Sequence, residues 1–140
     1  SSLFVADFIG QANTIRLPLL RLEKGEDRQE AYAAAALPAG GELRARILRP
    51  DSAGKDIHLV VRPEKVGVLG PGEAASSHGA ILEAKVVSTV FVGRHVEYEL
   101  DLGSLGIISA EQTFDPGSSL FQEGDRVLAA IDPANALFLP

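Results

Sequence analysis

Apolar and polar residues alternate along much of the chain, most clearly in its second half. From His95 to Leu102 every second residue is apolar, and the others are His95, Glu97, Glu99 and Asp101. This period of two predicts a strand with one buried face and one wet, acidic face. The long strand before it is predicted to carry five residues on one face: Leu82, Ala84, Val86, Val90 and Val92. Gly93-Arg94 lies between the two strands and suits the two-residue turn of a type II′ hairpin.

Short apolar runs bounded by turn residues predict further strands in the rest of the chain. They span residues 15–22, 43–48, 56–62, 105–112, 126–131 and 136–139. Pro18 in the first run has no N–H to donate to a neighbouring strand, which predicts an edge or bulge position. Ala31 to Leu37 is open between strand and helix, because its five alanines favour helix whereas its shortness and the following Pro38 do not.

Many short strands separated by regular turns are typical of a β-barrel or a β-sandwich. We expect an all-β fold, in which closure of a small barrel protects the strand edges from pairing with other chains. Residues 70–79 are rich in Gly, Pro, Ser and Ala and resemble a linker. Two small linked lobes, residues 13–68 and 79–140, are therefore an alternative to a single barrel, although no strong repeat relates them residue by residue.

The start of the chain predicts a short helix with an apolar side. Ser2 is suited to cap it and Gly10 to end it, and Phe4 and Phe8 lie four residues apart on one face. The chain begins with Ser1, contains no Met, and has no basic region followed by an apolar one as in a signal peptide. We therefore expect a piece of a longer protein, in which Phe4 and Phe8 packed against another part.

Composition and charge argue against several classes of function. The 140 residues include 13 basic and 19 acidic ones, giving a net charge of −6 at pH 7, whereas nucleic-acid binders usually show a basic face. The densest basic group is interpreted as a solvated strand face: Arg44, Arg46 and Arg49. Aromatic residues are too few to favour a surface for stacking bases. The absence of Cys excludes disulfides and thiolate metal sites and fits a reducing compartment.

No arrangement of residues points to catalysis or to a metal site. The Gly-Pro-Gly at residues 70–72 lacks the Gly-Lys-Ser/Thr ending that grips nucleotide phosphates. Ser76-Ser77-His78 has no neighbouring group to orient it as a nucleophile. Three histidines are expected on different elements or at the surface: His58, His78 and His95. The carboxylates of Glu97, Glu99 and Asp101 share one wet strand face, where they repel one another without forming an acid–base pair. We predict no catalytic, cofactor-binding or metal-ligating residue.

Arg62-Pro63-Glu64 is the densest local motif in the chain. Pro63 cannot donate to a neighbouring strand and is expected to end the strand before it. Arg62 and Glu64 flank the proline and have two interpretations, an ion pair that fixes a corner of the fold or a patch for another chain.

Four segments resemble the C-terminal part of nucleotide-binding subunits of ABC importers. Phe4 to Asn13 resembles the Phe-Val-Ala-x-Phe-Ile-Gly-x-x-Asn segment that follows their ATPase core, and Val61 to Val66 resembles their Arg-Pro-Glu motif. Gly79, with Val86 to Gly93 and Tyr98, is similar to their last barrel segment. Phe121 to Val127, with the terminal Leu137-Phe138-Leu139, completes the series. The four segments occur in the family's order and cover nearly the whole chain.

This resemblance implies a regulatory domain of the TOBE type, with a barrel like those that bind oligonucleotides or oligosaccharides and those of molybdate-binding proteins. Residues 1–12 then form a junction helix after an absent ATPase core, and residues 13–140 form the barrel domain. The core would bind ATP and Mg²⁺, whereas this piece carries no cofactor. The implied partners are that core, a second copy in a homodimer and, indirectly, the membrane permease subunits, with no nucleic acid. The implied location is the cytoplasmic face of the cell membrane.

The same resemblance yields candidate residues and an alternative function. The candidate interface or corner residues are Phe4, Phe8, Arg62, Pro63, Glu64, Phe91 and Gly93. Residues 8–13 are closest to the polyamine and ferric-iron branch of the family. The alternative is a sensor of a small molecule or oxyanion, bound between lobes or between chains. Related molybdate-binding barrels use a Ser-Ala-Arg-Asn stretch and a late Lys. The Asn and the Lys are missing near Ser76 to Gly79 and Asp132-Pro133, and Asp132 would repel an anion.

Overall fold

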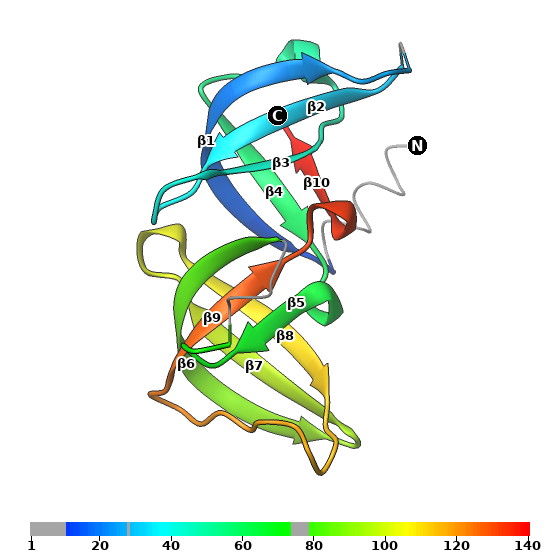
Figure 1. Ribbon diagram of the computed structural model, residues 1–140. Helices are drawn as coiled ribbons and strands as arrows, with labels where there is room; N and C mark the ends of the chain where they lie inside the picture. The colour runs from blue at the N-terminus through cyan, green and yellow to red at the C-terminus, as the bar shows by residue number, and fades with distance from the viewer. Residues whose placement is uncertain (1–10, 28, 74–78) are drawn as a thin grey trace. The chain divides into compact units, whose positions relative to one another are not determined.

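Figure 1 shows the computed structural model, which describes residues 11–27, 29–73 and 79–140. These residues form strands and short 3₁₀ helices, so the all-β prediction is confirmed. The chain divides into two compact units, of which the first comprises Ser1–Arg62 with Pro133–Pro140 and the second Pro63–Asp132. The predicted helix at residues 1–10, with Phe4 and Phe8, lies outside the described residues.

Five antiparallel strands form the sheet of the first unit, in the order β10-β4-β1-β2-β3. They are β1 (Asn13–Lys24), β2 (Ala31–Ala36), β3 (Glu42–Arg46), β4 (Asp56–Val61) and β10 (Ala136–Leu139), with 3₁₀ helices η1 (Pro50–Ser52) and η5 (Pro133–Asn135). Ile47, just after β3, forms a parallel bridge with Phe138 of β10. The Leu48 N–H donates to the Phe138 carbonyl at 3.0 Å. These contacts join the two outer strands and close the sheet into a barrel.

The second unit has five antiparallel strands in the order β5-β9-β6-β7-β8. They are β5 (Val66–Leu69), β6 (Ala80–Val92), β7 (His95–Asp101), β8 (Ile107–Thr113) and β9 (Arg126–Ile131), with η2 (Pro63–Lys65) and η4 (Gly103–Leu105). The Gln112 side-chain amide on β8 donates to the Val66 carbonyl on β5 at 2.8 Å, so the outer strands meet here too. Gly79 precedes β6 and lies so close to the Ile131 carbonyl that a Cβ would overlap it.

The two sheets share one topology, in which β1, β2, β3, β4 and β10 correspond to β6, β7, β8, β9 and β5. The long first strand has an irregular register at equivalent places, between Leu19 and Arg21 and between Val86 and Ser88. The Leu19 N–H donates to the Lys55 carbonyl at 3.0 Å, and the equivalent Val86 N–H donates to the Asp125 carbonyl at 2.9 Å. The structure therefore reveals an internal repeat, although equivalent side chains differ widely.

The last strand of each repeat belongs to the other unit. After β4 the chain passes through η2 and supplies β5 to the second unit; after β9 it passes through η5 and supplies β10 to the first. The predicted lobe boundaries, residues 13–68 and 79–140, are therefore wrong, because each assigns the final strand to the wrong lobe. Alternation along a strand shows that one face is buried but does not show which sheet the strand joins.

The segment left open between strand and helix is strand β2. Ala33, Ala34 and Ala35 are completely buried within it. The helical preference of alanine is weak, so the burial of these residues between β1 and β3 outweighs it. Pro18 lies in the middle strand of the sheet, at the last position where β1 pairs with β4 and next to the bulge. The prediction for Pro18 was an edge strand or a bulge, and the observed position is closer to the bulge.

The predicted single apolar face of β6 is wrong beyond its middle. Leu82, Ala84 and Val86 are buried, but Val90 and Val92 are 50% and 48% exposed. The register shift between Val86 and Ser88 changes which residues face inward. Thr89 is then paired with buried Tyr98, whereas Val90 is paired with exposed Glu97. A bulge therefore moves two valines from the core face to the solvent face.

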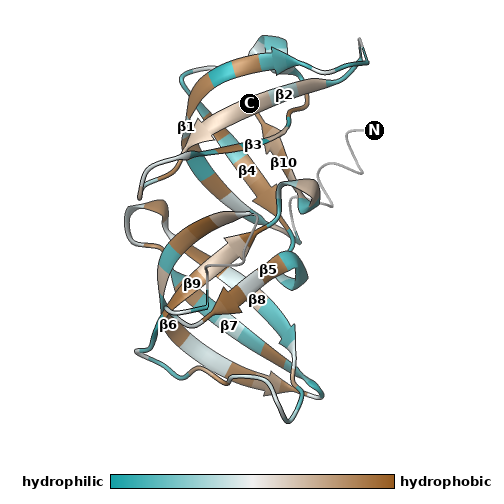
Figure 2. Cartoon of the chain, viewed as in Figure 1, coloured by the Kyte–Doolittle hydropathy of each residue, from teal (hydrophilic) through white to brown (hydrophobic). Residues whose placement is uncertain are grey.

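Aliphatic and small residues from alternate strand positions fill each barrel, and Figure 2 shows hydrophobic and hydrophilic residues alternating along the strands. In the first unit, Ile15, Leu59 and Phe138 are completely buried. In the second, Val66, Leu100 and Ile131 are completely buried. No helix among the described residues is long and apolar enough to cross a bilayer.

Candidate interaction surface and ligand cavity

The Arg62-Pro63-Glu64 motif lies where the chain passes from β4 into η2. β4 ends just before the motif and Pro63 opens η2. Arg62 and Pro63 are half-buried, whereas Glu64 is exposed. Pro63 also lines an open groove of about 270 Å³, together with Val90 and Glu97. The motif thus occupies a change of direction in the chain, and its role as an interface stays a prediction.

Phe91 and Gly93 lie together at the tip of the β6–β7 hairpin. Gly93 has a φ of +62°, a left-handed conformation that glycine adopts without strain, and it opens the predicted two-residue turn. Phe91 is 55% exposed and stands between the exposed Val90 and Val92. Successive strand residues point to opposite faces, so Phe91 lies on the face of Val96, whereas Val90 and Val92 lie on the other face with Glu97 and His95.

Phe114, from the loop after β8, adds a second exposed aromatic side chain next to Phe91. Its ring meets the ring of Phe91 edge to face, with centroids 5.7 Å apart and planes at 80°. The Phe114 N–H donates to the Arg94 carbonyl at 2.8 Å, which ties the loop to the hairpin turn. We call Phe91 and Phe114 the hairpin-tip patch. Phe114 is absent from the predicted site residues, although an aromatic side chain followed by Asp-Pro-Gly in a turn-rich segment is a usable signal.

The loop between β8 and β9 is fastened to the second barrel by hydrogen bonds from β6 and β7. Thr89 Oγ1 donates to the Phe121 carbonyl at 3.0 Å, and the Phe121 N–H donates to the Tyr98 hydroxyl at 3.2 Å. The Tyr98 and Phe121 rings also pack together, with centroids 6.3 Å apart. Because Tyr98 is only 3% exposed, this anchor lies inside the barrel rather than on its surface.

A partly open cavity of about 200 Å³ lies beside this loop, within the second unit. We call it the loop cavity. Phe114 and Phe121 contribute aromatic rings to its wall, and Tyr98, Gln112, Glu73 and Ser119 contribute polar groups. Gln112 Nε2 donates to the carbonyls of Val66 and Glu111, both at 2.8 Å. Tyr98 and Gln112 are also absent from the predicted site residues, because alternation identifies Tyr98 only as a core position.

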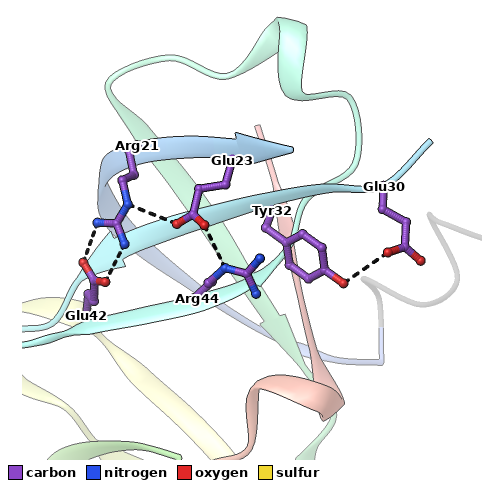
Figure 3. Close-up of polar contacts among 6 residues, drawn as sticks. All are labelled: Arg21, Glu23, Glu30, Tyr32, Glu42 and Arg44. Atoms are coloured by element: carbon purple, nitrogen blue, oxygen red, sulfur yellow. Dashed lines mark hydrogen bonds and ion pairs between the residues drawn. The ribbon is translucent and has the colours of Figure 1, made fainter. Parts of the chain in front are cut away.

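Six side chains on the outer face of β1, β2 and β3 and the loop before β2 form the polar network of Figure 3. Arg21 donates to both carboxylate oxygens of Glu42, at 2.7 and 2.6 Å, and to Glu23 at 3.0 Å. Arg44 donates to Glu23 at 3.0 Å, and its guanidinium lies 4.0 Å from the centre of the Tyr32 ring. The Tyr32 hydroxyl donates to Glu30 at 3.3 Å. This network crosses β2 from β1 to β3.

The Arg21–Glu42 pair shifts the pKa of both groups. The hydrogen bonds from Arg21 lower the pKa of Glu42 below its ordinary value, and the hydrogen bond with Glu42 raises the pKa of Arg21. Both groups therefore remain charged across the physiological range. Because the two groups neutralise each other's charge, we interpret this network as stabilising the barrel rather than as a binding or catalytic site.

Negative charge concentrates in the second unit. Residues 63–132 contain 11 acidic and 4 basic residues, a net charge of −7, whereas the remainder of the chain carries +1. The predicted acidic face is exposed, with Glu97, Glu99 and Asp101 on the outside of β7. His95 Nδ1 lies 3.5 Å from Glu111 in this unit. Within the described ranges, no three His, Asp or Glu side chains form a group suited to hold a metal.

A family model described as "TOBE domain" matches residues 59–139, more than half of the chain. The chain is 31% identical over 140 residues to the spermidine/putrescine import ATP-binding protein PotA of Rubrobacter xylanophilus, an alignment covering 97% of this chain and 33% of that protein. It is 27% identical to the Fe(3+) ions import ATP-binding protein FbpC of Rhizobium etli, covering 86% and 31%. The chain thus spans about a third of the length of these relatives.

A solved structure has the same fold. It is the cytoplasmic molybdate-binding protein ModG with molybdate bound, which matches with a TM-score of 0.73 at 20% identity, covering 91% of this chain and 96% of that one. The barrel fold expected from the resemblance is therefore confirmed. At this level of identity the likeness concerns the fold and not the ligand.

Proposed function

This chain belongs to the TOBE domain family, and on that premise we propose that it is the non-catalytic regulatory and dimerisation domain of the ATP-binding subunit of an ABC importer. The match to the last third of import ATP-binding proteins supports this assignment. ATP and Mg²⁺ would be bound by an ATPase core outside this chain. The names of the relatives favour a polyamine or ferric iron as cargo. We place the domain on the cytoplasmic side of the membrane, near the permease subunits.

The observation that carries the dimerisation proposal is the hairpin-tip patch. Its two aromatic side chains are 55% and 40% exposed and lie in the part of the chain that the family model covers. Large apolar side chains clustered on a soluble domain favour contact with another molecule. A second copy of the domain presents the same patch, so the two can pack face to face about a two-fold axis. Specific contacts of this kind bury at least about 1,000 Å² in total.

Sedimentation velocity of the 140-residue chain over a range of concentrations tests this proposal. We expect a reversible dimer that Phe91→Ser weakens at least roughly tenfold, because the buried ring contributes much of the contact. Leu22→Ser is the matched control, since Leu22 on β1 of the first unit is similarly exposed, at 45%. A chain that is monomeric at all concentrations contradicts the proposal. A dimer that both substitutions weaken equally also contradicts it.

A second candidate function is the sensing of a small molecule, and the loop cavity favours it. The cavity lies within one barrel, has a buried tyrosine in its wall and shares Phe114 with the hairpin-tip patch. A ligand that contacts Phe114 can therefore alter the surface that meets a second copy. Among the described lining residues there is a carboxylate but no Lys, Arg or His, which disfavours an oxyanion.

A further inference from the structure

The polar groups of the loop cavity have a defined hydrogen-bonding capacity. The Tyr98 hydroxyl accepts a hydrogen bond from the Phe121 N–H, and among the described residues no acceptor is placed for its own hydrogen. Both hydrogens of the Gln112 amide are used by the carbonyls of Val66 and Glu111, so its Oε1 is left to accept. Glu73 adds a carboxylate, which accepts only, and Ser119 adds a hydroxyl, which does both.

A matching ligand must accept a hydrogen bond from Tyr98 and donate hydrogen bonds to Gln112 and Glu73. An ammonium group donates but cannot accept, so it leaves the buried Tyr98 hydrogen without a partner. An oxyanion accepts but cannot donate, and Glu73 repels it. A hydroxyl group does both without charge. Neighbouring C–H groups can pack against the rings of Phe114 and Phe121.

The volume of the cavity limits the size of the ligand. A protein cavity of about 150 Å³ holds benzene, which has six non-hydrogen atoms. A cavity of about 200 Å³ therefore holds about six to ten such atoms. From this chemistry and size we infer that the loop cavity binds a small neutral polyol, such as a tetritol or a pentose. This inference rests on the second candidate function, ligand sensing, and is independent of dimerisation.

A titration of the ¹⁵N-labelled chain with erythritol and with ribose, followed by amide NMR shifts, tests the inference. We expect saturable shifts at Phe121, Ser119 and Gln112, with half-saturation on the order of 1–10 mM for a ligand with so few atoms. Putrescine and molybdate serve as the ammonium and oxyanion probes and should cause no saturable shift at these three amides. Saturation distinguishes binding from the general stabilisation that polyols give to any protein.

Tyr98→Phe keeps the ring and removes the hydroxyl, so it should raise the half-saturation concentration roughly fivefold. Glu97→Gln is the matched control, because Glu97 is the neighbouring residue and faces outward; it should leave polyol binding unchanged. If Tyr98→Phe fails to give a folded spectrum, Ser119→Ala provides the same comparison at an exposed wall position and should raise the half-saturation concentration at least twofold.

Saturable polyol shifts that Tyr98→Phe weakens and Glu97→Gln does not would support the site. The absence of saturable shifts at 100 mM polyol, or a stronger response of these amides to putrescine or molybdate, would overturn it. A monomeric chain that still binds the polyol refutes the dimerisation proposal alone. A dimer whose cavity does not bind the polyol refutes this inference alone.

Discussion

At the residue scale, Ala34 shows why β2, which long charged side chains cross, consists mainly of alanine. Ala34 points to the outer face of β2 and yet is completely buried. It pairs with Arg21 on one side and with Arg44 on the other. The pairs Arg21–Glu42 and Glu23–Arg44 each join β1 to β3 and so cross β2. Figure 3 shows these ion pairs spanning β2, and a methyl group is small enough to fit beneath them.

Ala34→Leu should therefore destabilise the chain by about 1–3 kcal/mol, because the larger side chain displaces the ion pairs or strains β2. Urea unfolding measures the change. Ala39→Leu, in the exposed turn after β2, introduces the same side chain and should remain within about 0.5 kcal/mol of the parent. Equal stability of the two variants would show that the ion pairs do not cover Ala34 tightly.

This residue also shows where prediction from sequence stops. Five alanines in a row of six predict helix as readily as strand, and the choice depends on β1 and β3, which lie on either side. The acidic face of β7 was easier to predict, because strict alternation over His95–Asp101 identifies it without reference to other strands. Tyr98 meets the rest of the site only through the folded loop after β8, so its part in the site leaves no local pattern in the sequence.

At the scale of elements, β10 is the strand on which the first barrel depends although it lies after the whole second barrel in sequence. Phe138 of β10 is completely buried, and it bonds to β4 on one side and to the end of β3 on the other. Without β10, the edges of β3 and β4 lose their partners, and the core of the first unit opens. The second unit retains all five of its own strands, β5 to β9.

Deletion of residues 133–140 should therefore remove the slow amide hydrogen exchange of β1 to β4 and leave that of β6 to β9 largely intact. Hydrogen exchange followed by NMR measures the two units separately. Phe138→Ala is the milder comparison and should cost about 3–5 kcal/mol while keeping both barrels folded. Persistence of slow exchange in β1 to β4 after the deletion would contradict the dependence on β10.

The strands themselves could be predicted from sequence far better than their partners. Alternation and turn residues located β3, β4, β7, β8, β9 and β10 to within a few residues of their observed bounds. The bulge after Val86 could not be seen, because one extra residue in a strand leaves the composition unchanged and alters only which face each later residue takes. The exchange of β5 and β10 between the units could not be predicted either, because strand pairing depends on residues far apart in the sequence.

At the scale of the whole molecule, the charge is unevenly divided, with −7 on the second unit and +1 on the remainder. The hairpin-tip patch belongs to the negative unit. If two copies meet through this patch, two negative units approach each other, and their repulsion opposes the apolar contact. Salt screens such repulsion, with a screening length of about 10 Å at 0.1 M and about 3 Å at 1 M.

The proposed dimer should therefore become tighter as the salt concentration rises, opposite to a contact held by ion pairs. Sedimentation velocity at 50 mM and 500 mM NaCl should show a dissociation constant several-fold lower at the higher concentration. Glu111→Gln, which removes one charge from the same unit, should reduce this salt dependence. A dimer that dissociates on addition of salt would place the contact on charged groups rather than on Phe91 and Phe114.

The exchange of strands also fixes an order of events during synthesis on the ribosome. Nascent chains usually fold their N-terminal parts first. Here the second barrel has all its strands once Ile131 has emerged, whereas the first barrel still lacks β10, which leaves the exit tunnel later. Of the two barrels, the one that is translated first is therefore completed last, and until then the open edges of β3 and β4 are the surface that a molecular chaperone would need to protect.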